Sequence, residues 1–311
     1  MELSSRDAQS LDVARLYYQR GLPQADIARK LSISRPTVSK LLQHAKDRGF
    51  VSIEIRDPRA VSSDVGRQLC ERFGLAQARV VAAADTDEEL LHELGGMGAQ
   101  VLEENVADGD LVGITWGRTM RAVAQALTPQ PSSGVHMVQL KGGSSLASPL
   151  VGHHETIRLL CAAFSAYPHT LPLPMLFDSP EVRQVVEQDR SIKYVLDLGR
   201  SARTAIFTVG SVPEDSPLLM RDVLTPSERA GVTRDAVGDL CSHFIDEHGR
   251  VAVPELDERT VSIPLEVLRR KEIRICVAGG AAKVPVLRAV LQAGFVSHLV
   301  TDERTARAVL G

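Results

Sequence analysis

The chain has 311 residues, of which 44% are hydrophobic and 24% are charged. This composition excludes a largely disordered protein, and the length fits one small and one large domain. The formal net charge of −3 is unevenly spread: residues 1–58 hold ten Lys and Arg against seven Asp and Glu, whereas the remaining residues hold 26 against 32. A basic N-terminal region followed by an acidic remainder is typical of a protein in which only the N-terminal region binds nucleic acid.

Neither a membrane span nor a signal peptide is expected. No run of about 18 apolar residues occurs, and the start MELSSRDAQS lacks a basic and an apolar region. We therefore expect a cytoplasmic protein. The four cysteines, at positions 70, 161, 241 and 276, are too scattered for a metal site or a disulfide framework. We expect reduced thiols, no metal and no cofactor.

The N-terminal region has the pattern of three short helices. Apolar residues between positions 11 and 19 share one face, residues 24–31 form a second helical stretch, and a third begins at Arg35. Ser34 is a good N-cap for that third helix, and Pro36 suits its first turn, where the missing N–H costs nothing. The spacing predicts a helix-turn-helix.

This predicted helix-turn-helix has an inner and an outer face. The positions required where two steeply crossed helices meet are small or apolar. Ile27 and Ala28 lie inside the second helix, Leu31 and Ile33 flank the turn, and Val38 and Leu41 face inward from the third helix. Ser32 stands in the turn, where glycine is often found. The outer face of the third helix is polar and basic, which favours contact with DNA. We expect base readout by Arg35, Thr37 and Gln43 and backbone contacts by Ser39 and Lys40; a helical hairpin with a solvated polar face is the alternative.

The domain boundary follows a candidate wing. Residues 50–55 alternate apolar and polar side chains, as a half-buried strand does, and Asp57 and Pro58 then break the pattern. We therefore assign residues 1–57 to a winged helix-turn-helix DNA-binding domain and residues 58–311 to a second, larger domain.

The larger domain alternates short apolar runs with helical stretches. The predicted strands are Val80–Ala84, Leu111–Thr115, Val135–Leu140, Thr204–Val209, Ile273–Ala278 and Val296–Thr301. The predicted helices include Asp87–Asn105, Thr119–Leu127, His154–Ala166, Glu181–Leu198 and Val284–Ala293. This rhythm predicts an α/β fold with a doubly wound, mainly parallel sheet. Ligands of such sheets bind beyond the carboxyl ends of the strands.

One strand end has the character of an anion site. Residues 111–115 lead into Gly117, Arg118 and Thr119, and a helix is expected to begin near Met120. Free N–H groups at that helix start, the Thr119 hydroxyl and the Arg118 guanidinium would together cradle a phosphate. A tight turn with a chance threonine is the alternative.

Two further strand ends carry a lysine beside glycines. Lys141 precedes Gly142 and could pair with a phosphate, attack an aldehyde as a nucleophile, or simply reach solvent. Lys283 follows a glycine pair and is a second candidate phosphate ligand. Gly210 follows another strand, and Asp239, expected on a helix, could accept hydrogen bonds from sugar hydroxyls.

Two other patterns do not indicate function. The run from His153 to Glu155 lacks the spacing that places two zinc ligands on one helical face. The glycines between Gly95 and Gly98 follow no strand, so close helix packing explains them better than a dinucleotide fingerprint.

Taken in order, eight segments of the chain resemble the SorC family of sugar-responsive bacterial transcription regulators, and most of all its deoxyribonucleoside-responsive members. They are ARLYYQ, SISRPTVSKLLQ, DGDLVGITWGRTM, VQLKGG, LPLPMLFD, FTVGSV, AVGDLCSHF and VAGGAAKV. The resemblance implies a winged helix-turn-helix joined to a Rossmann-like effector domain related to sugar-phosphate isomerases and deaminases. It also implies homodimers or homotetramers that bind double-stranded operator DNA.

The resemblance also implies roles for residues within these motifs. Phosphate would be held by Gly117, Arg118, Thr119 and Lys283, and the sugar would be lined by Lys141, Gly142, Gly210 and Asp239. Lysine is not general in the family at position 141, so its presence points to deoxyribose 5-phosphate held as a Schiff base. Arg118 stands where a smaller residue is expected.

The leading hypothesis is therefore a repressor, not an enzyme, that leaves its operator when a sugar phosphate binds. Two alternatives stay open. One is a sugar-phosphate isomerase or deaminase with a DNA-binding head, in which Asp239 would have to serve as the carboxylate base. The other is an activator that responds to the same ligand.

Overall fold

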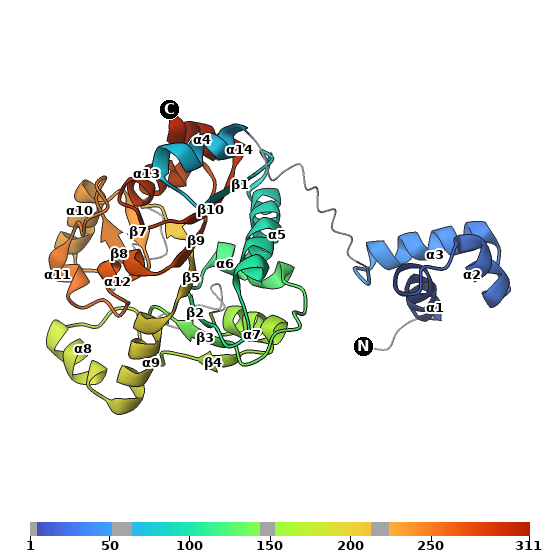
Figure 1. Cartoon of the computed structure of the whole chain (residues 1–311), viewed down its shortest axis with the longest axis horizontal. Coiled ribbons are helices and arrows are strands. Elements are labelled where there is room, and N and C mark those ends of the chain that lie inside the picture. The colour runs from blue at the N-terminus through green and yellow to red at the C-terminus, as the bar shows by residue number, and fades with distance from the viewer. Residues whose placement is uncertain (1–4, 52–63, 144–152, 213–223) are drawn as a thin grey trace. The chain divides into compact units, whose positions relative to one another are not determined.

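The chain forms two compact units, Met1–Pro58 and Arg59–Gly311. The computed structural model describes residues 5–51, 64–143, 153–212 and 224–311 (Figure 1). Most of the predicted wing, residues 50–55, lies outside the described residues. Among the helices that the structure describes, none is both long and apolar enough to cross a bilayer.

The N-terminal unit is a small helical bundle. Its elements are α1 Ser5–Ala14, the π-helical turn η1 Arg15–Gln19, α2 Gln24–Leu31 and α3 Arg35–Asp47. The predicted inner residues Ile27, Ala28, Val38 and Leu41 are buried in one cluster, which confirms the helix-turn-helix pattern. His44 Nε2 on α3 and the buried Asp7 carboxylate on α1 are hydrogen-bonded at 2.8 Å, so this bond also fastens α1 to α3.

The larger unit is built on one seven-stranded sheet. Its strands are β1 Gln77–Val81, β2 Leu111–Ile114, β3 His136–Gln139, β4 Tyr167–His169, β5 Thr204–Phe207, β9 Ile273–Val277 and β10 His298–Asp302. Their order is β1-β10-β9-β5-β2-β3-β4, and every pairing is parallel. The α/β prediction with a mainly parallel sheet is thus confirmed.

The helical elements described in the larger unit are α4 Asp64–Phe73, α5 Asp87–Asn105, α6 Arg118–Ala126, α7 His153–Phe164, α8 Pro180–Glu187, α9 Arg190–Ser201, α10 Pro226–Asp235, α11 Pro254–Asp257, α12 Leu265–Arg270, the 3-10 turn η3 Ala281–Lys283, α13 Val284–Gln292 and α14 Glu303–Leu310. Several of them pack on the sheet, and together they cover both of its faces.

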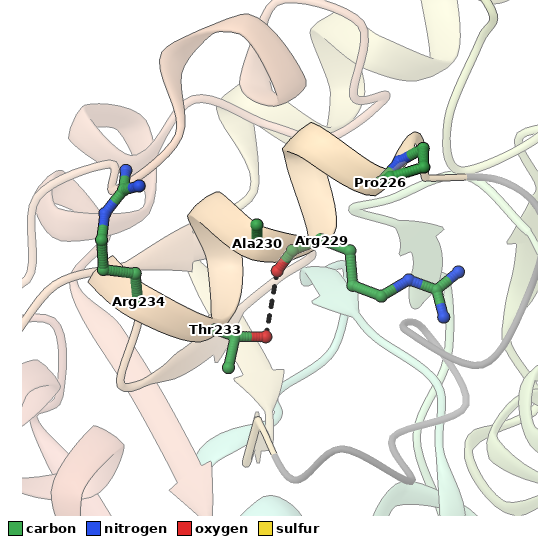
Figure 2. A pocket seen from close by; sticks show the side chains of 5 residues that line it. All are labelled: Pro226, Arg229, Ala230, Thr233 and Arg234. Atoms are coloured by element: carbon green, nitrogen blue, oxygen red, sulfur yellow. Dashed lines mark hydrogen bonds between the residues drawn. The ribbon is translucent and has the colours of Figure 1, made fainter.

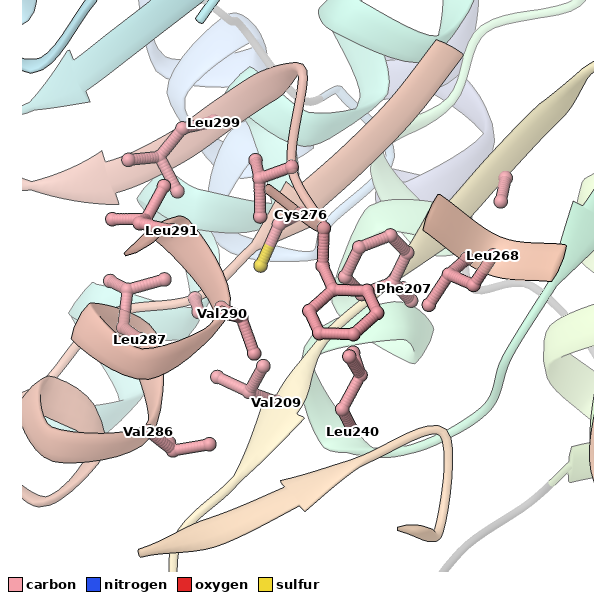
Figure 3. Close-up of a cluster of buried hydrophobic side chains, with 14 of the residues drawn as sticks. Phe207, Val209, Leu240, Leu268, Cys276, Val286, Leu287, Val290, Leu291 and Leu299 are labelled. Atoms are coloured by element: carbon pink, nitrogen blue, oxygen red, sulfur yellow. The ribbon is translucent and has the colours of Figure 1, made fainter. Parts of the chain in front are cut away.

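Two hydrophobic cores follow from the alternation of side chains along buried strands. On β9, Ile275 and Val277 join a cluster with α5, α6 and α7, whereas Cys276 between them joins a cluster with α4, α12, α13 and α14. Figure 3 shows the second cluster, in which Phe207 and Leu299 of the sheet pack against the α13 side chains. Strands buried on both faces read as continuous apolar runs, which is why the sequence revealed them.

A second, antiparallel sheet was not expected. It consists of β6 Val209–Gly210, β7 Gly238–Leu240 and β8 His243–Ile245 in that order. The chain enters it directly from β5, with only Thr208 between the two strands. The expectation that Asp239 lies on a helix is therefore wrong, because the Gly238–Leu240 segment pairs with β6 and β8 instead.

A second correction concerns the helix predicted over residues 181–198. The structure has two helices there, α8 and α9, separated at Asp189. The Asp189 carboxylate accepts hydrogen bonds from the backbone N–H groups of Ser191 at 2.9 Å and Ile192 at 3.4 Å. A side chain that caps a new helix takes a non-helical backbone conformation itself, so the helical pattern is interrupted.

The glycines of α5 have the packing role expected of them. A Cβ atom added at Gly95 would lie 2.8 Å from the backbone of Ala122 on α6, and one at Gly98 would lie 2.8 Å from Val123. Both distances are too short for a real contact. Glycine here lets α5 and α6 approach closely.

Candidate functional site

The five predicted DNA-contacting side chains share the exposed face of α3. Arg35, Thr37, Ser39, Lys40 and Gln43 are all exposed. Ser34 caps the helix as expected, because its hydroxyl accepts the Thr37 backbone N–H at 3.2 Å. Gln43 Nε2 also donates to Asp47 Oδ1 at 2.8 Å, so this amide would have to exchange partners to read a base. The arrangement leaves the first turns of α3 accessible to a duplex.

The second candidate site lies at the carboxyl ends of the central strands. From β2 the chain continues to β3 and then β4, which lie on one side of β2 in the sheet. From β5 it continues to β9 and then β10, which lie in the opposite direction. The neighbouring strands β2 and β5 therefore flank the point at which the strand order reverses, where ligands of open α/β sheets bind. The segments that follow β2, β3, β5 and β9 contain seven of the eight predicted effector residues, and the eighth, Asp239, lies on β7.

The start of α6 offers unpaired backbone donors. Gly117 is the N-cap residue, has φ +144°, and provides no side-chain cap, so the first N–H groups of the helix remain available to an anion. A side chain would be strained at this φ, which explains the glycine. Thr119 is buried, and Arg118 is exposed. The helix begins at Arg118, slightly before the predicted start.

Lys283 joins this helix start to the neighbouring strand end. Its ammonium donates to Thr119 Oγ1 at 3.4 Å and to Thr208 Oγ1 at 3.2 Å. Burial lowers the pKa of Lys283, although the Cys276 thiol and the Asp239 carboxylate act in the opposite direction. No ion pair of Lys283 is found among the described residues, so an incoming phosphate would supply a direct anionic partner. Sequence reasoning missed Thr208, although its position at the end of a predicted strand was a usable signal.

Asp239 reaches the same region from the small sheet. It is the register partner of Gly210, and a Cβ atom added at Gly210 would overlap the Asp239 carboxylate. The Ser242 backbone N–H donates to Asp239 Oδ2 at 3.1 Å and so fixes the carboxylate. Asp239 also lies close enough to influence the pKa of Lys283. A fixed acceptor beside a lysine suits recognition of a hydroxyl group.

Lys141 forms the other end of the site. Its side chain is 7% exposed, and its ammonium lies over the Trp116 ring, 4.1 Å from the ring centre. Trp116 Nε1 donates to the Gly142 carbonyl at 2.9 Å, which holds the indole in place. A side chain at Gly142 would overlap the Pro174 carbonyl, so only glycine fits there. Sequence reasoning included Trp116 in a motif but gave it no role.

A strained hairpin turn lies between Lys141 and Asp239. Cys241 and Ser242 both have positive φ, +52° and +73°, which non-glycine residues rarely adopt. Ser262 donates to the Cys241 carbonyl at 2.7 Å and pairs with Lys141 through an isolated bridge. Such strain persists only where surrounding contacts impose it, and it concentrates at functional sites. The turn therefore ties the lysine end of the site to the carboxylate end.

A surface depression on α10 is a different feature. It has a volume of about 620 Å³ and is lined by α10 alone, through Pro226, Arg229, Ala230, Thr233 and Arg234 (Figure 2). One exposed helix supplies all of its lining residues. The depression does not share a residue with the strand-end site, where groups from several strands converge.

Comparison with known proteins identifies the two units. The Sugar-bind family of sugar-binding domains matches residues 58–311, and the MarR family matches residues 12–60. The chain is 41% identical over 302 residues to the deoxyribonucleoside regulator of Bacillus subtilis, covering 97% of this chain and 96% of that protein. It is 31% identical over 304 residues to the sorbitol operon regulator of Klebsiella pneumoniae, covering 96% of each.

A solved structure agrees along the whole length. The full-length sorbitol operon regulator SorC from Klebsiella pneumoniae superposes with a TM-score of 0.76 at 29% identity, covering 99% of this chain and 100% of that one. The similar proteins are named as transcriptional regulators. The winged helix-turn-helix of the MarR type and the α/β sugar-binding domain are thereby established.

Proposed function

Because this chain belongs to the SorC family of sugar-binding transcriptional regulators, we propose that it is a repressor released from its operator by deoxyribose 5-phosphate. The observation that carries this proposal is the convergence of Lys283, Asp239 and Lys141 at the strand ends. One end of the site suits a phosphate, the middle suits a hydroxyl, and the other end presents a primary amine.

The phosphate is assigned to the α6 end of the site. Backbone N–H groups at the helix start, the Thr119 hydroxyl and the Lys283 ammonium can all donate to phosphate oxygens there. The helix dipole adds a favourable partial charge. Arg118 is exposed at the rim and adds a further positive charge close to Lys283.

The sugar is assigned to the space between Asp239 and Lys141. In its open-chain form the sugar has an aldehyde at C1, and the Lys141 amine can add to that carbon once its ammonium has released a proton, which gives a carbinolamine. The carbinolamine hydroxyl then takes up a proton and leaves as water, and the protonated imine that remains restores the positive charge over the Trp116 ring. The same ring face that holds the free ammonium would thus stabilise the adduct. The 41% identity to a deoxyribonucleoside regulator also favours a deoxyribose ligand.

The DNA-binding domain, residues 1–57, would act through a symmetric homodimer or homotetramer formed by residues 58–311. Two recognition helices related by symmetry bind two half-sites at a fixed spacing. A ligand that prefers an assembly with a different spacing would lower operator affinity by shifting the population.

Trapping with borohydride tests this proposal directly. Full-length protein is incubated with deoxyribose 5-phosphate, reduced, and analysed by intact mass. We expect one adduct in the wild type and in the control Lys193→Arg, which changes an exposed lysine on α9, and none in Lys141→Arg. An adduct that persists in Lys141→Arg would refute the Schiff base. Gel-shift titration then tests repression, because operator binding that ignores every pentose phosphate would refute the effector.

A further inference from the structure

The glycine loop that precedes Lys283 is bonded to a carboxylate from another strand. The Gly280 N–H donates to Asp302 Oδ2 at 3.0 Å and to Thr305 Oγ1 at 2.8 Å. A Cβ atom added at Gly279 would lie 2.5 Å from Asp302 Oδ2, so the carboxylate occupies the space that the glycine leaves open. Gly280 itself has φ +96°, which favours glycine. The loop is therefore shaped around Asp302.

Asp302 also caps the start of a helix. It is the N-cap of α14, where its Oδ1 accepts the Thr305 backbone N–H at 3.0 Å and its Oδ2 accepts the Thr305 hydroxyl at 2.5 Å. Asp302 and Thr305 are 3% and 1% exposed. Breaking any of these buried bonds would leave an unsatisfied polar group, which is costly. A displacement of the loop must therefore carry the start of α14 with it.

The far side of α14 packs on α4. Ala306 and Val309 of α14 share a hydrophobic cluster with Val65 and Leu69 of α4, and the Arg72 guanidinium donates to the Leu310 carbonyl. Figure 1 shows the two helices side by side. In the sequence, α4 is the first described element after the DNA-binding unit. A continuous set of contacts thus runs from the Lys283 loop to the helix that follows the DNA-binding unit in the chain.

We propose that Asp302 positions the loop that carries Lys283 and couples occupancy of the strand-end site, through α14 and α4, to DNA binding by the N-terminal unit. This inference rests on the proposed function. When phosphate draws Lys283 towards the start of α6, Asp302 and Thr305 transmit the loop movement to α14. Packed helices respond to such a change by shifts of about 1–2 Å rather than by deforming.

The test measures a coupling ratio in the full-length protein, defined as the Kd for DNA with deoxyribose 5-phosphate divided by the Kd without it. A duplex is selected from a random-sequence library with the wild type, and its Kd is measured without and with saturating deoxyribose 5-phosphate. Saturation is checked for each protein by thermal shift. The wild-type ratio should fall in the range of about 5 to 150 that is usual for allosteric proteins, and Asp302→Asn should bring it to within about twofold of unity. Asn keeps the shape, but in either orientation its NH2 group faces a backbone N–H, that of Gly280 or that of Thr305, so one of the two bonds is lost.

The matched control is Asp189→Asn. Asp189 is also an N-cap aspartate, but it caps α9 and does not contact the glycine loop. This variant should keep the wild-type ratio. A wild-type ratio in Asp302→Asn, at saturation, would overturn the inference while leaving the proposed function intact.

Hydrogen exchange of the wild type gives a second readout that does not depend on a variant. Adding deoxyribose 5-phosphate should change the exchange rates of amides in both α14 and α4, and in Asp302→Asn the change in α4 should be lost. An α4 that does not respond in the wild type would overturn the coupling route. If the wild type shows neither a thermal shift nor a change in Kd with any pentose or hexose phosphate, the proposed function fails, and the inference fails with it.

Discussion

The ammonium of Lys141 lies 4.1 Å from the centre of the Trp116 ring, and the indole N–H of Trp116 is bonded to the carbonyl of Gly142. The ring is therefore fixed by the residue next to the lysine that it covers. This pair gives the amine end of the site a defined position. It also makes Trp116, the only tryptophan in the chain, a direct probe of the site.

Replacing Trp116 should weaken the ligand without abolishing trapping. Trp116→Ala removes the cation–π contact, which is worth about 0.5–2 kcal/mol, so we expect the apparent affinity for deoxyribose 5-phosphate to fall roughly 2- to 30-fold. Trp116→Phe keeps an aromatic face, so its affinity should lie between those of the wild type and Trp116→Ala. Calorimetric titration measures the affinities. Equal affinities in all three proteins would show that the ring does not support the adduct.

Ligand binding should weaken as the pH rises through the lowered pKa of Lys283. Below that pKa the ammonium is already charged and pairs with phosphate; above it, binding must first take up a proton. Lys283→Arg should remove this alkaline loss, because a guanidinium stays charged. Both proteins should lose affinity below about pH 6, where the phosphate itself gains a proton. The same alkaline loss in Lys283→Arg would assign it to another group.

On α3, two substitutions should separate base reading from backbone binding. Arg35→Ala should cost about 1–3 kcal/mol on the preferred sequence and relax the preference at one base pair. Lys40→Ala should weaken binding to all duplexes alike and reduce the salt-dependence slope by about one. Fluorescence anisotropy on matched and mismatched duplexes over a range of salt tests this assignment. If Lys40→Ala relaxed the sequence preference and Arg35→Ala weakened binding to all duplexes alike, the two assignments would have to be exchanged.

The turn between α2 and α3 can be stabilised by one change. Ser32 has φ +53°, a left-handed conformation that costs an L-residue about 1–2 kcal/mol. Ser32→Gly should stabilise the N-terminal unit by about 0.5–1 kcal/mol after the extra flexibility of the unfolded glycine is subtracted. Ser39→Gly, inside α3, should instead destabilise it by about 0.5 kcal/mol. Hydrogen exchange of the α2 and α3 amides should show slower exchange in the first variant and faster in the second.

The sequence revealed the fold where one physical signal dominates. The bounds of α5 were predicted correctly, because the Thr86 side chain caps its start and the helical pattern continues unbroken to Asn105. The central strands were found because most of their residues are apolar and buried. By contrast, β4 is an edge strand that contains Pro168 and the exposed Tyr167, so it has no apolar run to detect.

The limits of prediction at the candidate site have a similar cause. Strand ends in a parallel sheet meet at one edge, so Lys141, Thr119 and Lys283 could be grouped from their local sequence alone. Asp239 was misplaced because three-residue strands carry too little periodicity to distinguish from a helix. Lys271 shows a further limit. Its buried ammonium bonds the Gly199 and Ala202 carbonyls, and no sequence pattern separates such a helix-capping lysine from a ligand-binding one.

The pairing of β1 with β10 sets an order of events during synthesis. Among the described strands, β1 pairs with β10 alone, and β10 ends at Asp302, so the sheet stays incomplete until Asp302 has left the ribosome. The α1–α3 bundle, in contrast, is held by contacts within residues 5–51. A nascent or prematurely terminated chain would therefore carry a folded DNA-binding unit before it carries a finished sensor. Quality control that removes truncated chains would then protect the regulated genes from a DNA-binding unit that lacks a complete sugar-binding domain.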